Sequence, residues 1–181
     1  MNIDQWIKDI IHAGERYTLP IMTHPGIEMI GATVKDVVQS GEKHAQAIYE
    51  LSKKYPSKAA TVIMDLTVEA EAFGSSIEFP ENDMPHILAR LVDSESIEDL
   101  QVPSLSVGRI PEYILANKLA AKMITDKPVF AGVIGPFSLA GRLYGMSEIM
   151  VDCYLEPDAI TLLLDKCTRF IEEYCMELKR T

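Results

Sequence analysis

The sequence has few basic residues and no long apolar run. Its 17 lysines and arginines face 27 aspartates and glutamates, for a formal net charge of −10. A nucleic-acid-binding surface needs clustered basic residues, so this balance argues against that class of protein. No run reaches the roughly 18 apolar residues of a membrane span. Asp4, Lys8 and Asp9 interrupt the apolar pattern near the N-terminus, unlike a signal peptide. We expect neither a nucleic-acid nor a membrane partner.

Cysteine is also scarce. Cys153, Cys167 and Cys175 form neither a CxxC pair nor the dense framework of a disulfide-rich domain. We therefore expect reduced thiols and a cytoplasmic protein. Neither an HExxH motif nor a His-x-Cys pair is present, so the sequence predicts no metal site of these kinds.

The 181 residues are enough for one domain with a hydrophobic core, and we interpret 1–181 as a single domain. Strands and helices alternate in the predicted order. The predicted strands cover 17–23, 60–65, 76–79 and 129–134, and the predicted helices cover 3–12, 33–54, 67–73, 110–125, 137–144, 146–153 and 158–178, with one or two helical turns over 86–92. Thr33 and Asp36 have the spacing of a capping box. Alternation of this kind predicts βαβ units and a parallel sheet, an α/β fold.

Asp65 is the strongest candidate for chemistry, because α/β folds place functional groups at the C-terminal ends of buried strands. Its neighbours from Val62 to Leu66 are apolar, so we expect its carboxylate at the rim of a dry cleft, where burial raises a carboxyl pKa. The alternative is that Asp65 bonds the amides that follow it, as a helix cap does. Glu69 and Glu71 favour the dipole of the next helix and are not expected to point into one cleft.

Residues after the first and the last predicted strands are secondary candidates. Thr23 and His24 follow the first strand in a predicted loop, where His24 is a candidate base, hydrogen-bond donor or metal ligand. A lone loop histidine is more often structural. Gly135 allows close backbone approach by a ligand, and Phe137 is placed to form a pocket wall. The other histidines, His12, His44 and His86, fall on helical patterns and are interpreted as structural.

Three blocks together resemble the uroporphyrinogen decarboxylase superfamily, and within it the cobamide-dependent methyltransferases. They are LPIMTHPGIEMIG (19–31), IMDLTVEAEAFGSSIEF (63–79) and GVIGPFSLAGRLYG (132–145). The resemblance implies a (β/α)8 barrel with its site at the C-terminal rim of the strands. Since such a barrel typically takes ~250 residues, we expect an incomplete barrel, an N-terminal helix followed by about three βα units.

The resemblance also assigns roles. Asp65 matches the aspartate at the centre of the decarboxylase cleft and is the implied catalytic residue. Thr23, His24, Gly135, Phe137 and Arg142 are the implied substrate-binding residues. The decarboxylases carry arginines just after the first strand and a tyrosine at the position of Arg142. This chain has neither, which argues against tetrapyrrole decarboxylation.

The methyltransferase branch holds zinc through a His-x-Cys pair and a distant cysteine, and the zinc converts a thiol acceptor to a thiolate. Those residues are missing here. We therefore expect the N-terminal portion of a corrinoid-dependent methyltransferase, with zinc and a methylated corrinoid belonging to the full-length family member and no cofactor bound by this chain alone. The expected partners are a corrinoid protein or free cobamide, a small-molecule methyl acceptor, and a second copy covering the open barrel edge.

Two alternatives remain open at this point. One is uroporphyrinogen decarboxylase itself, an enzyme of porphyrin biosynthesis. The other is a non-catalytic truncated barrel that docks a corrinoid protein.

Overall fold

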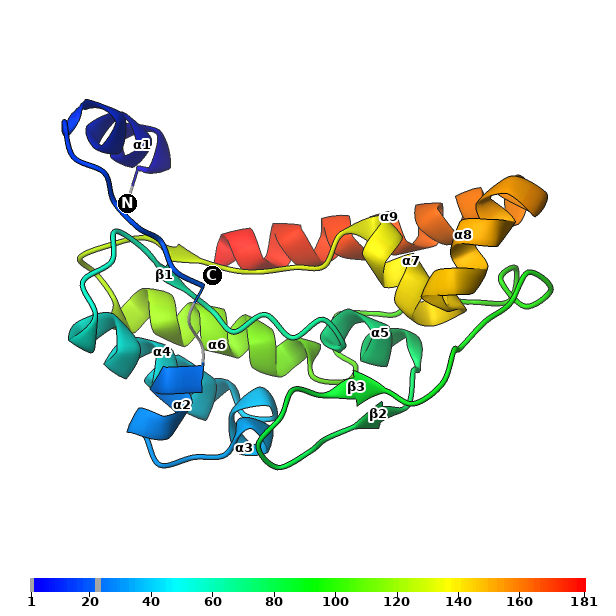
Figure 1. Cartoon of the computed structure of the whole chain (residues 1–181), viewed down its shortest axis with the longest axis horizontal. Coiled ribbons are helices and arrows are strands. Elements are labelled where there is room, and N and C mark those ends of the chain that lie inside the picture. Colours follow the sequence, from blue (N-terminus) through cyan, green and yellow to red (C-terminus); the bar gives the residue numbers. More distant parts are fainter. Residues whose placement is uncertain (1, 22–23) are drawn as a thin grey trace.

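A computed structural model describes residues 2–21 and 24–181 of the chain (Figure 1). Most of the described residues are helical. The elements are α1 (Ile3–His12), α2 (His24–Met29), α3 (Val34–Val38), α4 (Gly41–Lys54), β1 (Ala60–Thr61), α5 (Val68–Phe73), β2 (Ile77–Glu78), β3 (His86–Ile87), α6 (Ile110–Met123), β4 (Val129–Phe130), α7 (Pro136–Tyr144), α8 (Met146–Leu155) and α9 (Pro157–Arg180). The predicted helices at 3–12, 67–73, 110–125, 137–144, 146–153 and 158–178 are confirmed, with small shifts at their ends.

The parallel sheet is confirmed as one pair of strands, β1 and β4. Ala60 lies opposite Val129 and Thr61 opposite Phe130. Both strands are shorter than predicted. Two residues after the end of β1, the amide of Ile63 donates to Nε2 of His44 (2.8 Å) rather than to a neighbouring strand. A side chain thus replaces a strand as the hydrogen-bond partner at this point. Of the predicted strand 17–23, the described residues 17–21 form no strand.

His44 is a structural histidine, as predicted. Only 1% of the residue is exposed, and its ring packs edge-on against Tyr113 with the centroids 5.0 Å apart. Burial lowers the pKa of His44 to about 4, so the ring is neutral near pH 7 and its Nε2 is free to accept the Ile63 hydrogen bond. This contact ties α4 to the strand end beside the candidate site.

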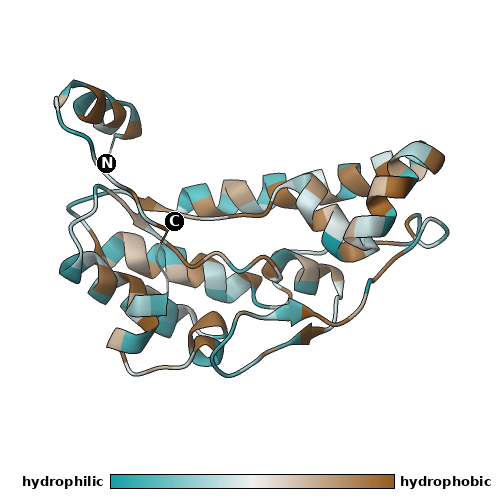
Figure 2. Ribbon diagram, viewed as in Figure 1, coloured by the Kyte–Doolittle hydropathy of each residue, from teal (hydrophilic) through white to brown (hydrophobic). Residues whose placement is uncertain are grey.

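The largest apolar cluster lies among α5, α6, α7, α8 and α9. Figure 1 shows α4 and α6 side by side, with α7 and α8 packed at one end of α9. Figure 2 shows apolar residues along each of these helices, although on α8 only Ile149 is buried. Phe73 and Phe170 meet edge to face at 5.3 Å, which joins α5 to α9. This packing positions the segments that follow β1 and β4.

Two predicted elements near the N-terminus are wrong. The His24-Pro25-Gly26 loop is instead the first turn of α2, because α2 packs closely on α4: a Cβ on Gly26 would lie 2.5 Å from the Ala47 carbonyl oxygen. The single helix over 33–54 is two helices, α3 and α4. The helix breaks between α3 and α4 because Ser40 has an extended backbone. The Ser40 side chain caps α4 by accepting a hydrogen bond from the Lys43 amide.

The helical turns predicted over 86–92 are also wrong. His86–Ile87 forms β3, which pairs antiparallel with β2. Glu78 lies opposite His86, with its carboxylate 3.2 Å from the imidazole Nε2. Cross-strand pairing outside the reach of local sequence patterns decided this segment.

The capping box predicted at Thr33 is confirmed, and it supports a stability prediction. The Thr33 hydroxyl accepts from the Asp36 amide at 3.1 Å, and the Asp36 carboxylate accepts from the Thr33 amide at 3.1 Å. Replacing Thr33 with alanine should therefore lower the free energy of unfolding by about 1 kcal/mol in urea titrations. Thr125→Ala, at an exposed threonine, is the matched control. Equal effects of the two substitutions would contradict the prediction.

The first helix stands apart from the rest of the described chain in Figure 1. None of its residues is buried. Trp6 attaches it, donating from Nε1 to the Lys58 carbonyl (3.2 Å) and packing edge-on against Phe130. Among the described residues, no helix combines the length and the apolar character needed to cross a membrane.

Candidate functional site

A pocket of about 690 Å³ lies where the chain leaves β1 and β4. Met64 and Leu66 line it after β1, and Val133 and Gly135 line it after β4. The rest of its wall comes from β3 and the segment after it, from α7 and from the start of α8. Carboxyl ends of parallel strands are the usual ligand-binding edge of an α/β fold, and the volume suits a small molecule.

A second groove, of about 780 Å³, runs between α1 and the loops at 56–58 and 126–127. Those loops precede β1 and β4, so this groove lies at the amino ends of the strands. In parallel sheets the amino ends carry stability more often than chemistry. The pocket at the carboxyl ends is therefore the better candidate site.

Asp65 does not lie at the rim of that pocket, which corrects the prediction. Its side chain is only 1% exposed. Its neighbours Met64 and Leu66 line the pocket, whereas Asp65 itself faces α6. Its Oδ1 accepts from the Thr67 amide (2.9 Å) and hydroxyl (2.8 Å), so the capping alternative is confirmed in part. Thr67, rather than Asp65, is the N-cap residue of α5.

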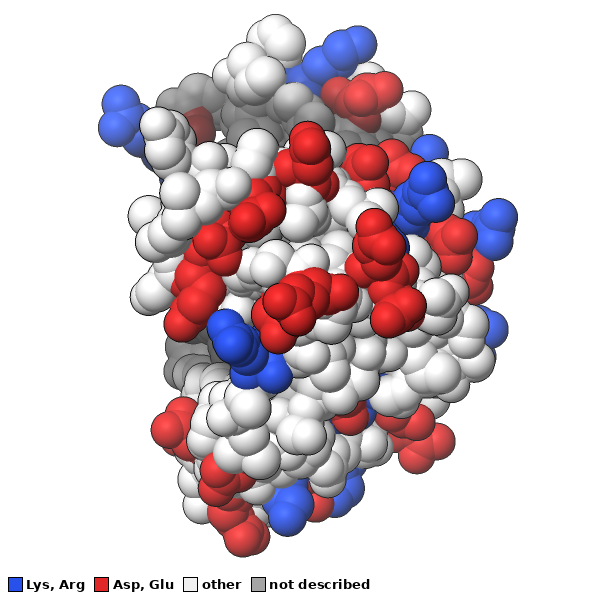
Figure 3. Space-filling view, turned by 90° about the vertical axis from the view of Figure 1, so that its right-hand side faces the viewer, with Lys and Arg blue, Asp and Glu red and all other residues white. Residues whose placement is uncertain are grey.

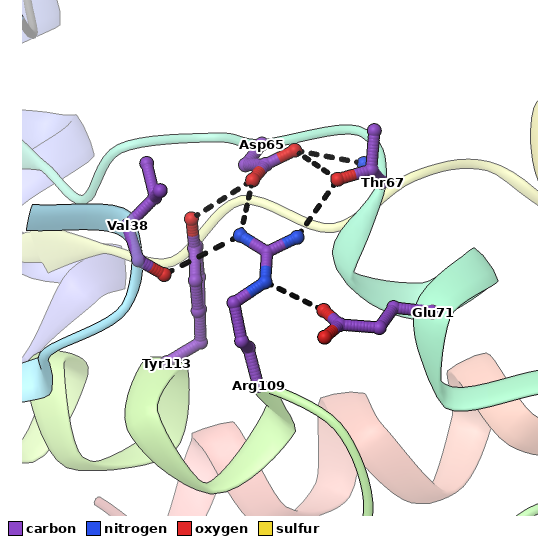
Figure 4. A network of polar contacts seen from close by, with 6 residues as sticks. All are labelled: Val38, Asp65, Thr67, Glu71, Arg109 and Tyr113. Carbon is purple, nitrogen blue, oxygen red and sulfur yellow. Dashed lines mark hydrogen bonds and ion pairs between the residues drawn. The ribbon is translucent and has the colours of Figure 1, made fainter. Parts of the chain in front are cut away.

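The main partner of Asp65 is Arg109, which precedes α6 (Figure 4). Arg109 Nη1 donates to Asp65 Oδ2 at 2.5 Å, and Nη2 donates to the Thr67 hydroxyl at 2.8 Å. Its Nε donates to Glu71 at 2.5 Å, and its guanidinium carbon lies 4.8 Å from the Phe79 ring centroid. Burial lowers the pKa of Arg109, but the charge of Asp65 and the hydrogen bond to it outweigh this, so the net shift is upward.

This cluster leaves Asp65 little capacity for a ligand. A carboxylate has about four lone-pair positions. The two Thr67 donors occupy Oδ1, while Arg109 and the Tyr113 hydroxyl (3.5 Å) occupy Oδ2. Asp65 is therefore suited to holding the strand end, α5 and α6 together rather than to accepting hydrogen bonds from a substrate.

Glu69 is a second buried carboxyl, and it contacts the wall of the pocket directly. Only 3% of the residue is exposed, and Oε1 accepts from the amide of Ile134, a lining residue, at 3.1 Å. Its Oε2 is buried without a hydrogen-bond partner among the described residues. Burial raises the pKa of Glu69 to about 7. As predicted, Glu69 and Glu71 do not point to the same place: Glu69 bonds the Ile134 amide and Glu71 bonds Arg109. Both have specific partners within the protein, in addition to complementing the helix dipole.

The structure brings together two of the predicted binding residues. Gly135 and Arg142 both line the pocket. Phe137 is 43% exposed and does not line it, and neither does His24, an exposed residue at the start of α2. Thr23 lies outside the described residues.

The comparisons with known proteins decide the family. The model of the uroporphyrinogen decarboxylase (URO-D) family matches residues 20–179, most of the chain. The chain belongs to the uroporphyrinogen decarboxylase family. The resemblance of the three sequence blocks is thereby confirmed at the level of the family.

The relatives of this URO-D family chain include two methyltransferases. It is 32% identical over 153 residues to the methylcobamide:CoM methyltransferase MtbA of Methanosarcina mazei, covering 76% of this chain and 44% of that protein. It is 32% identical over 120 residues to MtbA of Methanosarcina acetivorans, covering 65% of this chain and 35% of that protein. The chain thus spans less than half the length of these relatives.

The fold comparison agrees. A solved methyltransferase from Methanosarcina mazei superposes with a TM-score of 0.84 at 20% identity, covering 99% of this chain and 56% of that one. At this identity the match supports the fold alone. The α/β expectation is confirmed at that level, with mixed helices and strands and a parallel strand pair.

The zinc implied for the methyltransferase branch does not fit the described residues of this URO-D family chain. Among residues 2–21 and 24–181, no group of three or more His, Cys, Asp or Glu side chains is placed to hold a metal ion. Cys153 and Cys175 are exposed and Cys167 is buried, and all three thiols are free. A zinc site would need ligands other than those described here.

The sequence interpretation missed Arg109 and Arg90. Arg109 stands between a polar stretch and the start of the predicted helix 110–125, and no role was predicted for it. A usable signal existed: the chain has only six arginines, and one directly before a Pro-initiated helix is close to buried structure. Arg90, which lines the pocket, fell in a segment mistaken for helix.

Proposed function

We propose that this chain supplies part of the active site of a corrinoid-dependent methyltransferase that moves a methyl group between a cobamide and a thiol. The observation that supports it most is the pocket at the carboxyl ends of β1 and β4, in a chain whose relatives are methylcobamide:CoM methyltransferases. An incomplete (β/α)8 barrel, a corrinoid protein or free cobamide as donor, self-association over the open edge, and a cytoplasmic location belong to the same proposal.

In the proposed reaction the thiol sulfur forms the new bond to the methyl carbon. The cobalt–carbon bond breaks with its electron pair remaining on cobalt, and the thiol proton passes to solvent. The residues of this chain bind and orient the acceptor: Met64, Leu66 and Val133 offer apolar walls, and Gly135 leaves open space, since a Cβ there would meet nothing within 4 Å. Holding the reacting atoms in line lowers the barrier by removing translational and rotational freedom beforehand.

The buried state of Asp65 argues against the decarboxylase alternative. In that reading Asp65 stands at the centre of the substrate cleft, yet its side chain is 1% exposed and all of its lone-pair positions face donors of the protein itself. We therefore propose a structural role for Asp65, in place of the catalytic one expected from the sequence.

The test is an assay of the protein expressed from its intact gene. We expect methylated coenzyme M to accumulate from methylcobalamin and coenzyme M well above the protein-free rate, measured by mass spectrometry under anaerobic conditions. Absence of product would contradict the proposal. Loss of carboxyl groups from uroporphyrinogen would favour the decarboxylase, and binding of a corrinoid protein without turnover would favour the docking module.

A further inference from the structure

The pocket is basic although the molecule is acidic. The chain carries a formal net charge of −10, and acidic side chains predominate on the face shown in Figure 3. The residues that line the pocket nevertheless include Arg90, Arg142 and His86, and no aspartate or glutamate. Cationic groups gathered around a low-dielectric cavity raise the local concentration of anions.

Arg142 is the cation with the fewest competing contacts. It forms no ion pair with a carboxylate anywhere in residues 2–21 or 24–181. His86, by contrast, lies 3.2 Å from Glu78, and Arg90 is close enough to Asp93 to interact with its charge. An anion entering the pocket would therefore meet Arg142 without displacing a partner of the protein.

The helix α7 presents this arginine at the pocket together with Ser138, whose hydroxyl is a neutral donor. Ser138, Gly141 and Arg142 have the spacing of one helical face, and all three line the pocket, as does Gly145, which follows the helix. The first turn of α7 begins directly after Gly135, another lining residue. The positive end of the helix dipole at this turn favours a negative charge nearby.

We propose that the pocket binds a ligand through an anionic group, a sulfonate, carboxylate or phosphate, that is held by Arg142 with support from Arg90 and Ser138. An arginine fork matches these oxygen-rich groups geometrically as well as electrostatically. We identify the molecule that carries this anionic group as the small-molecule methyl acceptor, and that identification rests on the proposed function. The alkyl part of that acceptor lies against Met64 and Leu66.

The test titrates the protein, without cobamide, with 2-mercaptoethanesulfonate, ethanesulfonate, propionate and ethyl phosphate in a calorimeter. We expect at least one anion to bind, and Arg142→Gln to weaken its binding by about tenfold or more, as for a lost charged hydrogen bond. Arg142→Lys should retain part of the affinity, because it keeps the charge. Arg169→Gln, at an exposed arginine outside the pocket, is the matched control and should change nothing.

Two results would overturn the anion site. One is that 2-mercaptoethanol, which has no anionic group, binds as tightly as 2-mercaptoethanesulfonate. The other is that Arg142→Gln and Arg169→Gln have the same effect. Anion binding that depends on Arg142 without any methyl transfer would reject the proposed function and retain the site, so the two failures are distinguishable.

Discussion

Replacing Arg109 with methionine should lower the free energy of unfolding by about 3–5 kcal/mol, the range for breaking a buried ion pair from one side. The substitution leaves Asp65, 1% exposed at its side chain, without its countercharge and leaves Glu71 with an unpaired carboxylate. Methionine retains much of the arginine's length and apolar contact, so the loss reports on charge rather than on a cavity. Chemical denaturation at pH 7 measures it.

A double-mutant cycle separates the pair from its surroundings. Arg109→Met combined with Asp65→Asn should recover part of the loss, because the second substitution removes the uncompensated charge. Arg169→Met at an exposed position serves as the control and should change stability little. A loss under 1 kcal/mol for Arg109→Met alone, or additive losses in the double variant, would show that Asp65 is solvated, contrary to the structure.

Replacing Glu69 with glutamine should remove a large pH dependence of stability. Burial raises the pKa of Glu69 from 4.5 to about 7 in the folded protein. Between these values the unfolded chain releases the proton and the folded chain keeps it, so stability falls as pH rises. The fall amounts to on the order of 3 kcal/mol, at about 1.4 kcal/mol for each pH unit. Below pH 4.5 both states are protonated and the effect is absent.

The measurement is the free energy of unfolding at pH 4 and pH 8 for the wild type and two variants. In the Glu69→Gln variant the side-chain carbonyl oxygen can still accept a hydrogen bond from the Ile134 amide, as Oε1 of Glu69 does at 3.1 Å. The wild type should lose up to about 3 kcal/mol of unfolding free energy between pH 4 and pH 8 through Glu69, and the variant should not show this loss. Glu172→Gln, at an exposed glutamate on α9, is the control. Parallel pH profiles for wild type and Glu69→Gln would reject a raised pKa at Glu69.

Together these predictions describe a site with two separate layers. The pocket layer, with Arg142 and Gly135, faces the ligand side of the strand ends. The layer beneath it, centred on Arg109 and Asp65, is buried and satisfied by its own hydrogen bonds. Substitutions in the lower layer should therefore change stability first, and substitutions in the upper layer should change binding first.

Much of the helical framework could be predicted from the sequence because its signals are local. Periodic apolar residues marked α6 and α9, and the Thr33–Asp36 spacing marked a cap that the structure contains. The three blocks also identified the family that the comparisons established. Local signals failed at α2 and β3, where packing on α4 and pairing with β2 prevailed.

The orientation of Asp65 was beyond the reach of such signals. Its position after a buried apolar run could be read from the sequence, and so could its two alternatives, cleft or cap. Its partner Arg109 lies 44 residues further along the chain, in a stretch without periodicity. Which side of the strand end faces α6 depends on how the helices pack. The sequence alone therefore determined that a carboxylate stands at this strand end, and only the tertiary structure decided that it is buried against an arginine, because a charge can be buried there only where folding brings its countercharge.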